Sequence, residues 1–325
     1  MVGKKSGVAA RIREINPWLV QSRCVCHRLQ LVCKDSDGDC NEVQNLTQVL
    51  RKTYNFISKS SAKLVELKEY QKLRDERQLK VLKFCDIRWL CKFNCVNQIR
   101  QIYGSVLDLV YKHKNPDLEK DSKVREKAEV VFEMLASYET LFLVFILSDL
   151  LNQVNLVFKK WQSESVHVMD VFGELEVLKN FIILNYLSNE NEIGGLFYQE
   201  LNAKFSNLST LAENHYINKY KIARTDEEHL RLIKITKKFA KSLLDHLEER
   251  FQEANFLRAL RIFDVRYLVK NLNRFEKSYQ EFTKDFGSIL AHFKNAKEIL
   301  EKEKIIEEQN ENNSVELEKK NKSLE

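Results

Sequence analysis

Two short stretches in the first third of the chain hold the residue types that could do chemistry. In the first, Cys24-Val25-Cys26-His27, two residues separate the Cys24 thiol from the His27 imidazole, and that spacing suits two zinc ligands. A closed zinc site needs a second pair of ligands, and no second His lies near the remaining cysteines. We therefore predict no metal site: the cysteines pack as small apolar side chains, and zinc on Cys24 and His27 is the alternative.

The second stretch, Asp86-Ile87-Arg88-Trp89-Leu90, places a guanidinium beside an indole where a strand is expected to give way to a helix. An Arg in that position can bind a phosphate and a Trp can stack on a base, although a buried Trp beside a surface Arg is the more common arrangement. Other basic residues extend this hypothesis of a DNA contact. The candidate DNA-contacting set is Lys4, Lys5, Arg11, Arg28 and Arg88.

Other patterns that are typical of enzymes do not occur in the sequence. Asp35, Asp37 and Asp39 alternate like the ligands of a calcium loop, but the Gly and the closing Glu of an EF-hand are missing, so a solvated loop is favoured. Neither a Gly-x-Ser-x-Gly nucleophile elbow nor a phosphate-binding P-loop is present.

Helices are expected to position these residues. The 325 residues include 2 Pro and 8 Gly, and 44% are hydrophobic, which indicates a globular chain with few helix breakers. Apolar spacing predicts a helix over 7–15, a long helix from residue 42 to about 77, and another from residue 90 to about 111. The Val and Cys content of 18–26 predicts a short strand there, and a weak alternation of apolar and polar residues predicts a second one over 79–87.

Asn115-Pro116 is the clearest break, and the pattern beyond it is helical throughout. Two pairs of residues have the spacing of a helix N-cap and its N3 position: Asp39 with Glu42, and Thr225 with Glu228. We predict further helices near 120–137, 138–162, 166–187, 193–220, 226–252 and 273–308.

Charge divides the chain at the same break. Residues 1–115 carry 22 Lys and Arg against 11 Asp and Glu, whereas the rest of the chain carries 31 against 36. A basic segment joined to an acidic one is typical of a part that faces nucleic acid and a part that faces protein, or simply of Lys-rich helices in solvent. We predict three parts: 1–115, a helical domain over 116–298, and a charged tail over 299–325 that is frayed or disordered.

No apolar run approaches the roughly 18 residues that span a bilayer. The longest, Leu141–Leu147, ends at Ser148, so we expect no membrane partner. The 7 cysteines occur without a secretory signal, which indicates a reducing compartment, either the nucleus, which we favour, or the cytoplasm.

Taken together, CVCHRLQLVCKD and CDIRWL resemble the hAT superfamily of DNA transposases, and more closely its domesticated, host-encoded descendants. MVGKKSGVAARIREINPWLV, LSDLLNQVNLVFKKWQSESVHVMDVFGEL and RALRIFDVRYL extend the likeness over nearly the whole chain. The resemblance implies a mostly α fold, in which a partial ribonuclease-H-like α/β segment over 1–115 leads into an all-helical insertion domain. The family-motif positions, which line or buttress the family's active site, are Cys24, His27, Arg88 and Trp89.

In that family, three carboxylates hold two divalent metal ions that activate water or a 3′-hydroxyl. The stretch with the second Asp is expected just before Met1, the first Asp further upstream, and the catalytic Glu after the last residue. We therefore predict no catalytic residue, no enzyme activity and no cofactor in this chain. The family's dimerisation region is also expected outside it, which leaves the oligomeric state open.

The resulting hypothesis is a catalytically inactive, transposase-derived protein that acts in the nucleus as a binding module. Protein partners are expected, and DNA is expected to bind without sequence specificity. One alternative is a fragment of a transposase that cleaves and joins DNA when complete. The other is a zinc-stabilised protein-interaction module built on the N-terminal cysteines.

Overall fold

The computed structural model describes residues 7–16, 24–84, 89–162, 168–206 and 215–252, with short stretches between 259 and 298. The chain divides into two compact units. The larger, which we call the main unit, comprises Val25–Val166 and Glu174–Phe251. The other comprises Met1–Cys24, His167–Gly173 and Gln252–Glu325, and it contains α1 (Val8–Ile15).

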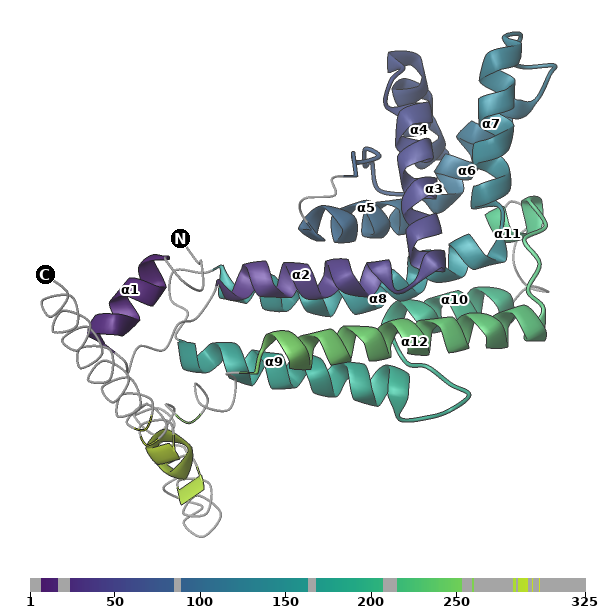
Figure 1. The fold of residues 1–325 in the computed structure, drawn as a ribbon. Helices are drawn as coiled ribbons and strands as arrows, with labels where there is room; N and C mark the ends of the chain where they lie inside the picture. The colour runs from purple at the N-terminus through teal and green to yellow at the C-terminus, as the bar shows by residue number, and fades with distance from the viewer. Residues whose placement is uncertain are drawn as a thin grey trace, which may run out of the picture. The chain divides into compact units, whose positions relative to one another are not determined.

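The main unit has two parts, a helical bundle and an arm that projects from it (Figure 1). The bundle helices are α2 (Val25–Gly38), α5 (Trp89–Gln101), α8 (Tyr138–Trp161), α10 (Leu196–Ser206) and α12 (Asp226–Arg250). The arm helices are α3 (Asn41–Ile57), α4 (Ser61–Leu73), α6 (Tyr103–Lys114) and α7 (Ser122–Leu135). Two short elements pack on these parts: η1 (Ile183–Leu187), a π-helical turn after α9 (Val168–Ile182), contacts α12 of the bundle, and α11 (Tyr216–Lys219) contacts α6 of the arm.

Helix α8 is the core of the main unit. It is apolar on all sides, as expected of a helix that is surrounded, and it contacts α2, α3, α5, α7, α10 and α12. Among the described helices, α8 alone is long and apolar enough to cross a membrane. However, 83% of its apolar window is buried inside the structure, which is typical of a core helix.

Ser148 and Asp149, the polar residues that end the longest apolar run, lie within α8 and are hydrogen-bonded there. The Ser148 hydroxyl donates to the carbonyl of Val144 at 2.7 Å. The Asp149 carboxylate accepts from the backbone N–H groups of Phe197 and Tyr198 at 2.9 and 2.8 Å, so it caps the start of α10. Burial raises the pKa of Asp149, and this effect outweighs the hydrogen bonds, which act to lower it.

Most of the predicted helices are confirmed, including the first at Val8–Ile15 and the capping box of α12, where Thr225 Oγ1 accepts from the N–H of Glu228 at 3.2 Å. α6 ends at Lys114, directly before the predicted break. Two predicted long helices are each split, because a turn over 58–60 separates α3 from α4 and Ile102 separates α5 from α6. The tail over 299–325 lies outside the described residues.

The predicted N-cap at Asp39 is wrong by one residue. Cys40 occupies the N-cap of α3 and makes no side-chain capping hydrogen bond. The Asp39 carboxylate instead accepts from the Ser242 hydroxyl at 2.6 Å and lies 3.0 Å from His246 Nε2, so it connects α12 to the end of α2.

The two predicted strands are wrong wherever their residues are described. Val25 and Cys26 begin α2, whose buried face includes Leu29, Val32 and Cys33, so packing overrides the local β propensity. Residues 79–84 have no regular secondary structure, and carbonyls in this segment bond to side chains: that of Leu79 accepts from Gln71 Nε2 at 2.8 Å. Residues 18–23 and 85–88 lie outside the described part.

The described residues are therefore mostly helical and include no β-strand, so the α/β character predicted for 1–115 finds no support among them. Helices on both sides of residue 115 pack together, since α6 contacts α7 and α3 contacts α7. The division at 115 and 116 stays a prediction.

Candidate functional site

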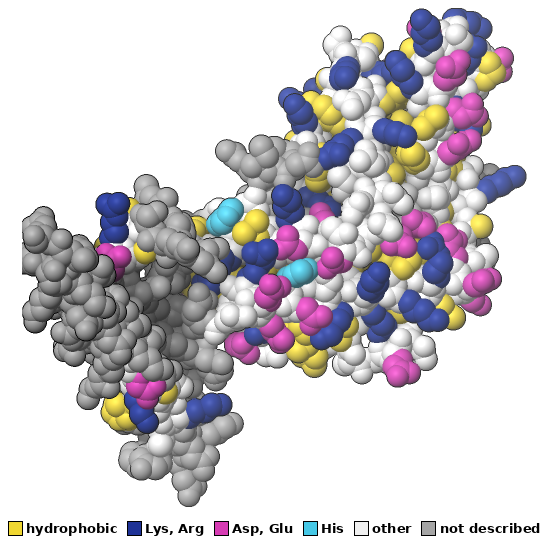
Figure 2. Space-filling model, in the orientation of Figure 1, with side chains coloured by type: hydrophobic (Ala, Val, Ile, Leu, Met, Phe, Trp, Pro, Cys, Tyr) yellow, Lys and Arg dark blue, Asp and Glu magenta, His cyan; other side chains and the backbone are white. Residues whose placement is uncertain are grey.

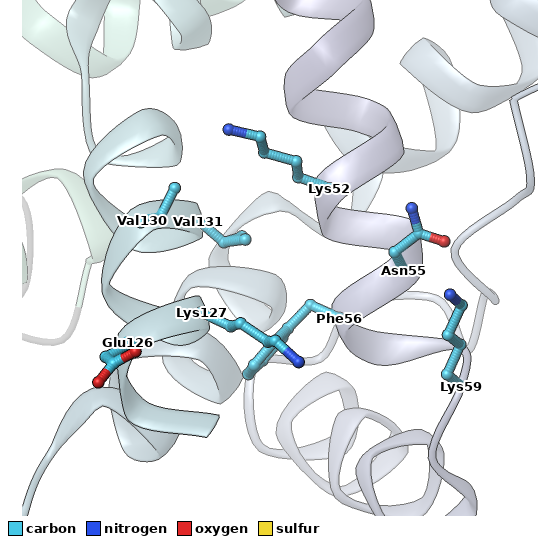
Figure 3. Close-up of a pocket in the computed structure, with 8 residues that line it drawn as sticks. All are labelled: Lys52, Asn55, Phe56, Lys59, Glu126, Lys127, Val130 and Val131. Carbon is cyan, nitrogen blue, oxygen red and sulfur yellow. The ribbon is translucent and has the colours of Figure 1, made fainter. Parts of the chain in front are cut away.

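A groove of about 490 Å³ lies between α3 and α7 in the arm. Figure 3 shows the side chains of α3 along one side of the groove and those of α7 along the other. Its apolar members are Phe56 and Val131, which are buried, and Val130, which is 43% exposed. The full lining is Lys52, Asn55, Phe56, Lys59, Glu126, Lys127, Val130 and Val131.

Helical spacing explains why these residues share one groove. On α3, Asn55 and Phe56 follow Lys52 by one turn, and Lys59 lies in the turn that ends the helix. On α7, Val130 and Val131 follow Glu126 and Lys127 by one turn. The groove exists because α3 and α7, which are far apart in the sequence, pack against each other.

Three of the residues that line the groove are lysines. Lys52, Lys59 and Lys127 are exposed, and none of them forms an ion pair with another residue that the structure describes. Glu126 is the single carboxylate in the lining. Figure 2 shows Lys and Arg side chains with hydrophobic ones between them over the face formed by α3, α4 and α7, together with several Asp and Glu side chains on the α7 side.

A fourth lysine covers the aromatic ring of the groove. Lys63 Nζ lies 3.6 Å from the ring centroid of Phe56, which is a cation–π contact. Burial lowers the pKa of Lys63, against the attraction of Glu119 and Glu66. The His113 ring meets Phe56 edge-on, with 5.9 Å between the ring centroids.

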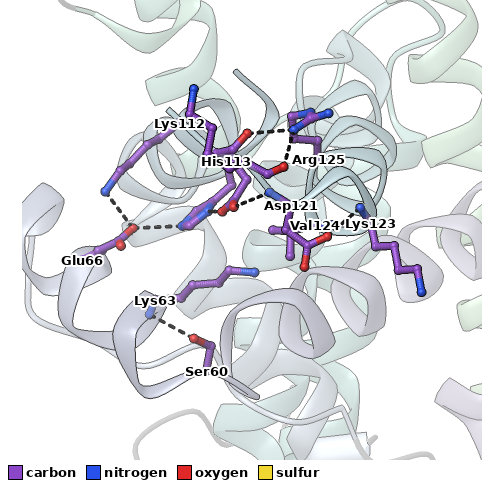
Figure 4. Close-up of polar contacts among 11 residues, drawn as sticks. Ser60, Lys63, Glu66, Lys112, His113, Asp121, Lys123, Val124 and Arg125 are labelled. Atoms are coloured by element: carbon purple, nitrogen blue, oxygen red, sulfur yellow. Dashed lines mark hydrogen bonds and ion pairs between the residues drawn. The ribbon is translucent and has the colours of Figure 1, made fainter. Parts of the chain in front are cut away.

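A polar network behind Phe56 holds the groove in shape (Figure 4). His113 Nε2 lies 2.9 Å from Glu66 Oε2 and Nδ1 lies 2.7 Å from Glu119 Oε2, so one imidazole connects α4 to the segment before α7. Hydrogen bonds from His113 and from the N–H of Asp121 lower the pKa of Glu119. Asp121 caps α7 by accepting from the N–H of Lys123 at 2.9 Å.

The motif pair Cys24 and His27 does not form a recognised metal site. Cys24 is an exposed thiol just before α2, and His27 is exposed in the first turn of that helix. Within the described ranges, no group of three or more His, Cys, Asp or Glu side chains could hold a metal ion. The described cysteines are free thiols: Cys24, Cys26, Cys33, Cys40, Cys91 and Cys95.

Arg28, a predicted DNA contact, takes part in packing. Only 5% of it is exposed, its guanidinium carbon lies 4.5 Å from the ring centroid of Phe251, and Nη1 donates to the carbonyl of Arg250 at 2.9 Å. These contacts join α2 to the end of α12. The structure thus gives Arg28 a role within the fold, and its DNA contact stays a prediction.

The other predicted positions are not brought together with the groove. Arg11 is exposed on α1, in the smaller unit. Trp89 is the first residue of α5, and its side chain, like all of Lys4, Lys5 and Arg88, lies outside the described part. The groove lysines were missed: the basic charge of 1–115 indicated a cationic surface, but Lys127 comes from the other segment.

A second cavity, which we call the cleft, has a volume of about 340 Å³ and is lined by six charged residues, two more than the groove. Three of its charges are paired: Glu200 lies 3.0 Å from Arg100 and 3.4 Å from Lys204. The Arg100 guanidinium stacks on Phe197, with 3.6 Å to the ring centroid. Its lining is Asp75, Glu76, Arg77, Arg100, Gln101, Tyr103, Phe145, Glu200, Lys204 and Tyr216.

A buried polar cluster on α4, α6 and α11 adjoins the cleft. Asp108, 6% exposed, accepts two hydrogen bonds from Arg74, one of them 3.0 Å long, and further ones from Lys219 at 2.8 Å and from the Tyr220 hydroxyl. Burial opposes the ionisation of Asp108, but these hydrogen bonds prevail and lower its pKa.

No protein-family model matches this chain, and no solved structure matches it.

Proposed function

We propose that this chain is a non-catalytic, hAT-transposase-derived binding protein that engages an anionic macromolecule through the groove between α3 and α7. The observation that carries the proposal is the set of three exposed lysines around one groove, none of them ion-paired within the described residues. Like charges that lack local compensation repel each other, and an anionic partner relieves that repulsion and gains Coulomb energy.

The resemblance of CVCHRLQLVCKD and CDIRWL to the transposase family supports the origin and a nuclear location. A ribonuclease-H-like core and a helical insertion domain belong to the same proposal. Catalysis does not belong to it, because the family's three carboxylates have no counterpart in the motifs that match. Binding is the activity that the groove supports.

The test is a titration of the full chain with two fluorescent polyanions, short duplex DNA and polyglutamate. We expect saturable binding to at least one of them, with an affinity that falls steeply as salt rises, since ion pairs dominate. The triple variant Lys52→Glu, Lys59→Glu, Lys127→Glu should bind at least about tenfold more weakly.

A matched triple variant controls for net charge. Lys34, Lys159 and Lys234 are exposed, lie on α2, α8 and α12, and are changed to Glu in the same way. This control should retain affinity within about threefold, because distant surface charges are screened. Equal losses in the two triple variants, or no binding of either polyanion by the unmodified chain, would overturn the proposed function.

A further inference from the structure

The apolar part of the groove limits what can occupy it. Val130 is 43% exposed, and the buried side chains of Phe56 and Val131 lie beside it in the lining, so the groove has an apolar floor with one exposed member. A phosphate placed on this surface would lose water without gaining a hydrogen bond there, which costs free energy. The favoured occupant therefore brings apolar side chains to the middle of the groove and negative charge to its edges.

The placement of the lysines suits a helix. Lys52 and Lys59 lie near opposite ends of the α3 side, and Lys127 faces them from α7 (Figure 3). An amphipathic helix with apolar residues at i, i+3, i+4 and i+7 presents one narrow apolar stripe with a polar flank on each side. Carboxylates on both flanks of such a stripe would meet lysines on both sides of the groove.

Nucleic acid fits the same surface less well. Base stacking needs an open aromatic face, but Phe56 is 8% exposed, Lys63 covers its ring at 3.6 Å, and His113 meets it edge-on. The lining also contains no Arg, the residue that most often makes bidentate contacts to phosphate and base edges.

We propose that the groove binds an acidic amphipathic helix of a partner protein. The inference rests on the proposed function, because it names the partner of the same site. The lysines supply charge complementarity on both sides, and Val130 supplies the exposed apolar contact in between.

The probe is a synthetic peptide with Leu at i, i+3, i+4 and i+7 and Glu on both flanks. Its control is a peptide of the same composition with the order shuffled. Fluorescence anisotropy with the full chain should show that the amphipathic peptide binds at least about tenfold more tightly than the shuffled one, which corresponds to about 1.4 kcal/mol.

Two variants locate the binding, and each has a matched control. Val130→Glu places a carboxylate on the apolar surface, and Lys127→Glu reverses one edge, so each should weaken peptide binding at least about tenfold. The controls are Val177→Glu, at a Val that is 61% exposed on α9, and Lys234→Glu on α12, and both should leave the affinity within about twofold. Circular dichroism establishes that all four variants are folded.

The outcomes separate the inference from the proposed function. If the shuffled peptide binds equally well, or if Val130→Glu does not affect binding, the helix inference fails. If duplex DNA binds in a Lys127-dependent way and the peptide does not, the inference fails while the proposed function stands. If sedimentation shows self-association that Val130→Glu abolishes, the occupant is a second copy of this chain, and the inference also fails. If neither peptide nor polyanion binds, both fail.

Discussion

The groove and the cleft contain similar residue types in opposite electrostatic states. In the cleft, Arg100 and Lys204 share the Glu200 carboxylate, and the neighbouring Asp108 is held by three further side chains. In the groove, Lys52, Lys59 and Lys127 have no ion-pair partner among the described residues. Arg100, Lys204 and Glu200 therefore satisfy one another, whereas the groove lysines are satisfied by solvent or by a partner.

This difference indicates which cavity holds the fold together and which one binds. Paired charges between helices cost free energy when one member is removed, because the other is left buried without a partner. Exposed charges without a protein partner contribute little to stability and much to association. Substitutions in the cleft region should therefore change stability, and those in the groove should change binding.

The largest expected effect is at Asp108. Asp108→Ala leaves Arg74 and Lys219 without their shared carboxylate, and we expect the free energy of unfolding to fall by about 3 kcal/mol. Urea denaturation followed by circular dichroism measures it. The matched control is Asp117→Ala, at an exposed Asp, with an expected change below about 0.5 kcal/mol. Equal effects of the two substitutions would remove the distinction between the two regions.

The cluster of charged and polar groups around Asp108 also illustrates what the sequence could not predict. Helices such as α12 follow from apolar spacing and from the local capping of Thr225, which are properties of neighbouring residues. Asp108 meets Arg74, Lys219 and Tyr220, which come from two other segments, and Lys127 reaches the groove only because α7 packs on α3. Such sites depend on tertiary packing, and the failed strand prediction at Val25 has the same cause.

A smaller effect is expected at Gly104, which allows the helices of the cleft to approach closely. A Cβ at this position would lie 2.9 Å from Glu76 Oε1 and 3.0 Å from Tyr216 Cδ1, which is too close. Gly104→Ala should therefore destabilise the protein by about 1–3 kcal/mol. Gly173→Ala, at a helical Gly with nothing within 4 Å, should instead stabilise it by about 0.5–1 kcal/mol. Thermal melting distinguishes the two signs, and a neutral Gly104→Ala would contradict the tight packing of the cleft.

The next effect is a pH dependence at His215, near the cleft. Burial, with Lys204 and Arg74, lowers the pKa of His215 from 6.5 to about 4, and its Nδ1 accepts from the N–H of Ile217 at 3.3 Å. Between pH 6.5 and about pH 4, His215 binds a proton in the unfolded chain but not in the folded protein. The stabilisation is therefore complete above pH 6.5 and is lost as the pH falls towards 4.

Because His215 is partly exposed, we expect this loss to be about 1–2 kcal/mol rather than the full value of the shift. His215→Asn keeps a side-chain acceptor at the N-cap but does not titrate. Urea denaturation at pH 7 and pH 4.5 should show a smaller drop in stability for the variant than for the unmodified protein. An unchanged drop would assign the pH dependence to other groups and would leave the cleft without this feature.

The smallest effect on stability is expected in the groove itself. Lys52→Ala, Lys59→Ala and Lys127→Ala each remove an exposed charge without an ion-pair partner in the described structure, so each should change the free energy of unfolding by less than about 0.5 kcal/mol. Lys63→Ala is the internal contrast, because it removes the cation from the Phe56 ring and should cost about 1 kcal/mol. If Lys127→Ala destabilised the protein more than Lys63→Ala, the groove lysines would stabilise the fold. The groove and the cleft would then both serve stability, and the distinction between a binding region and a stabilising region would fail.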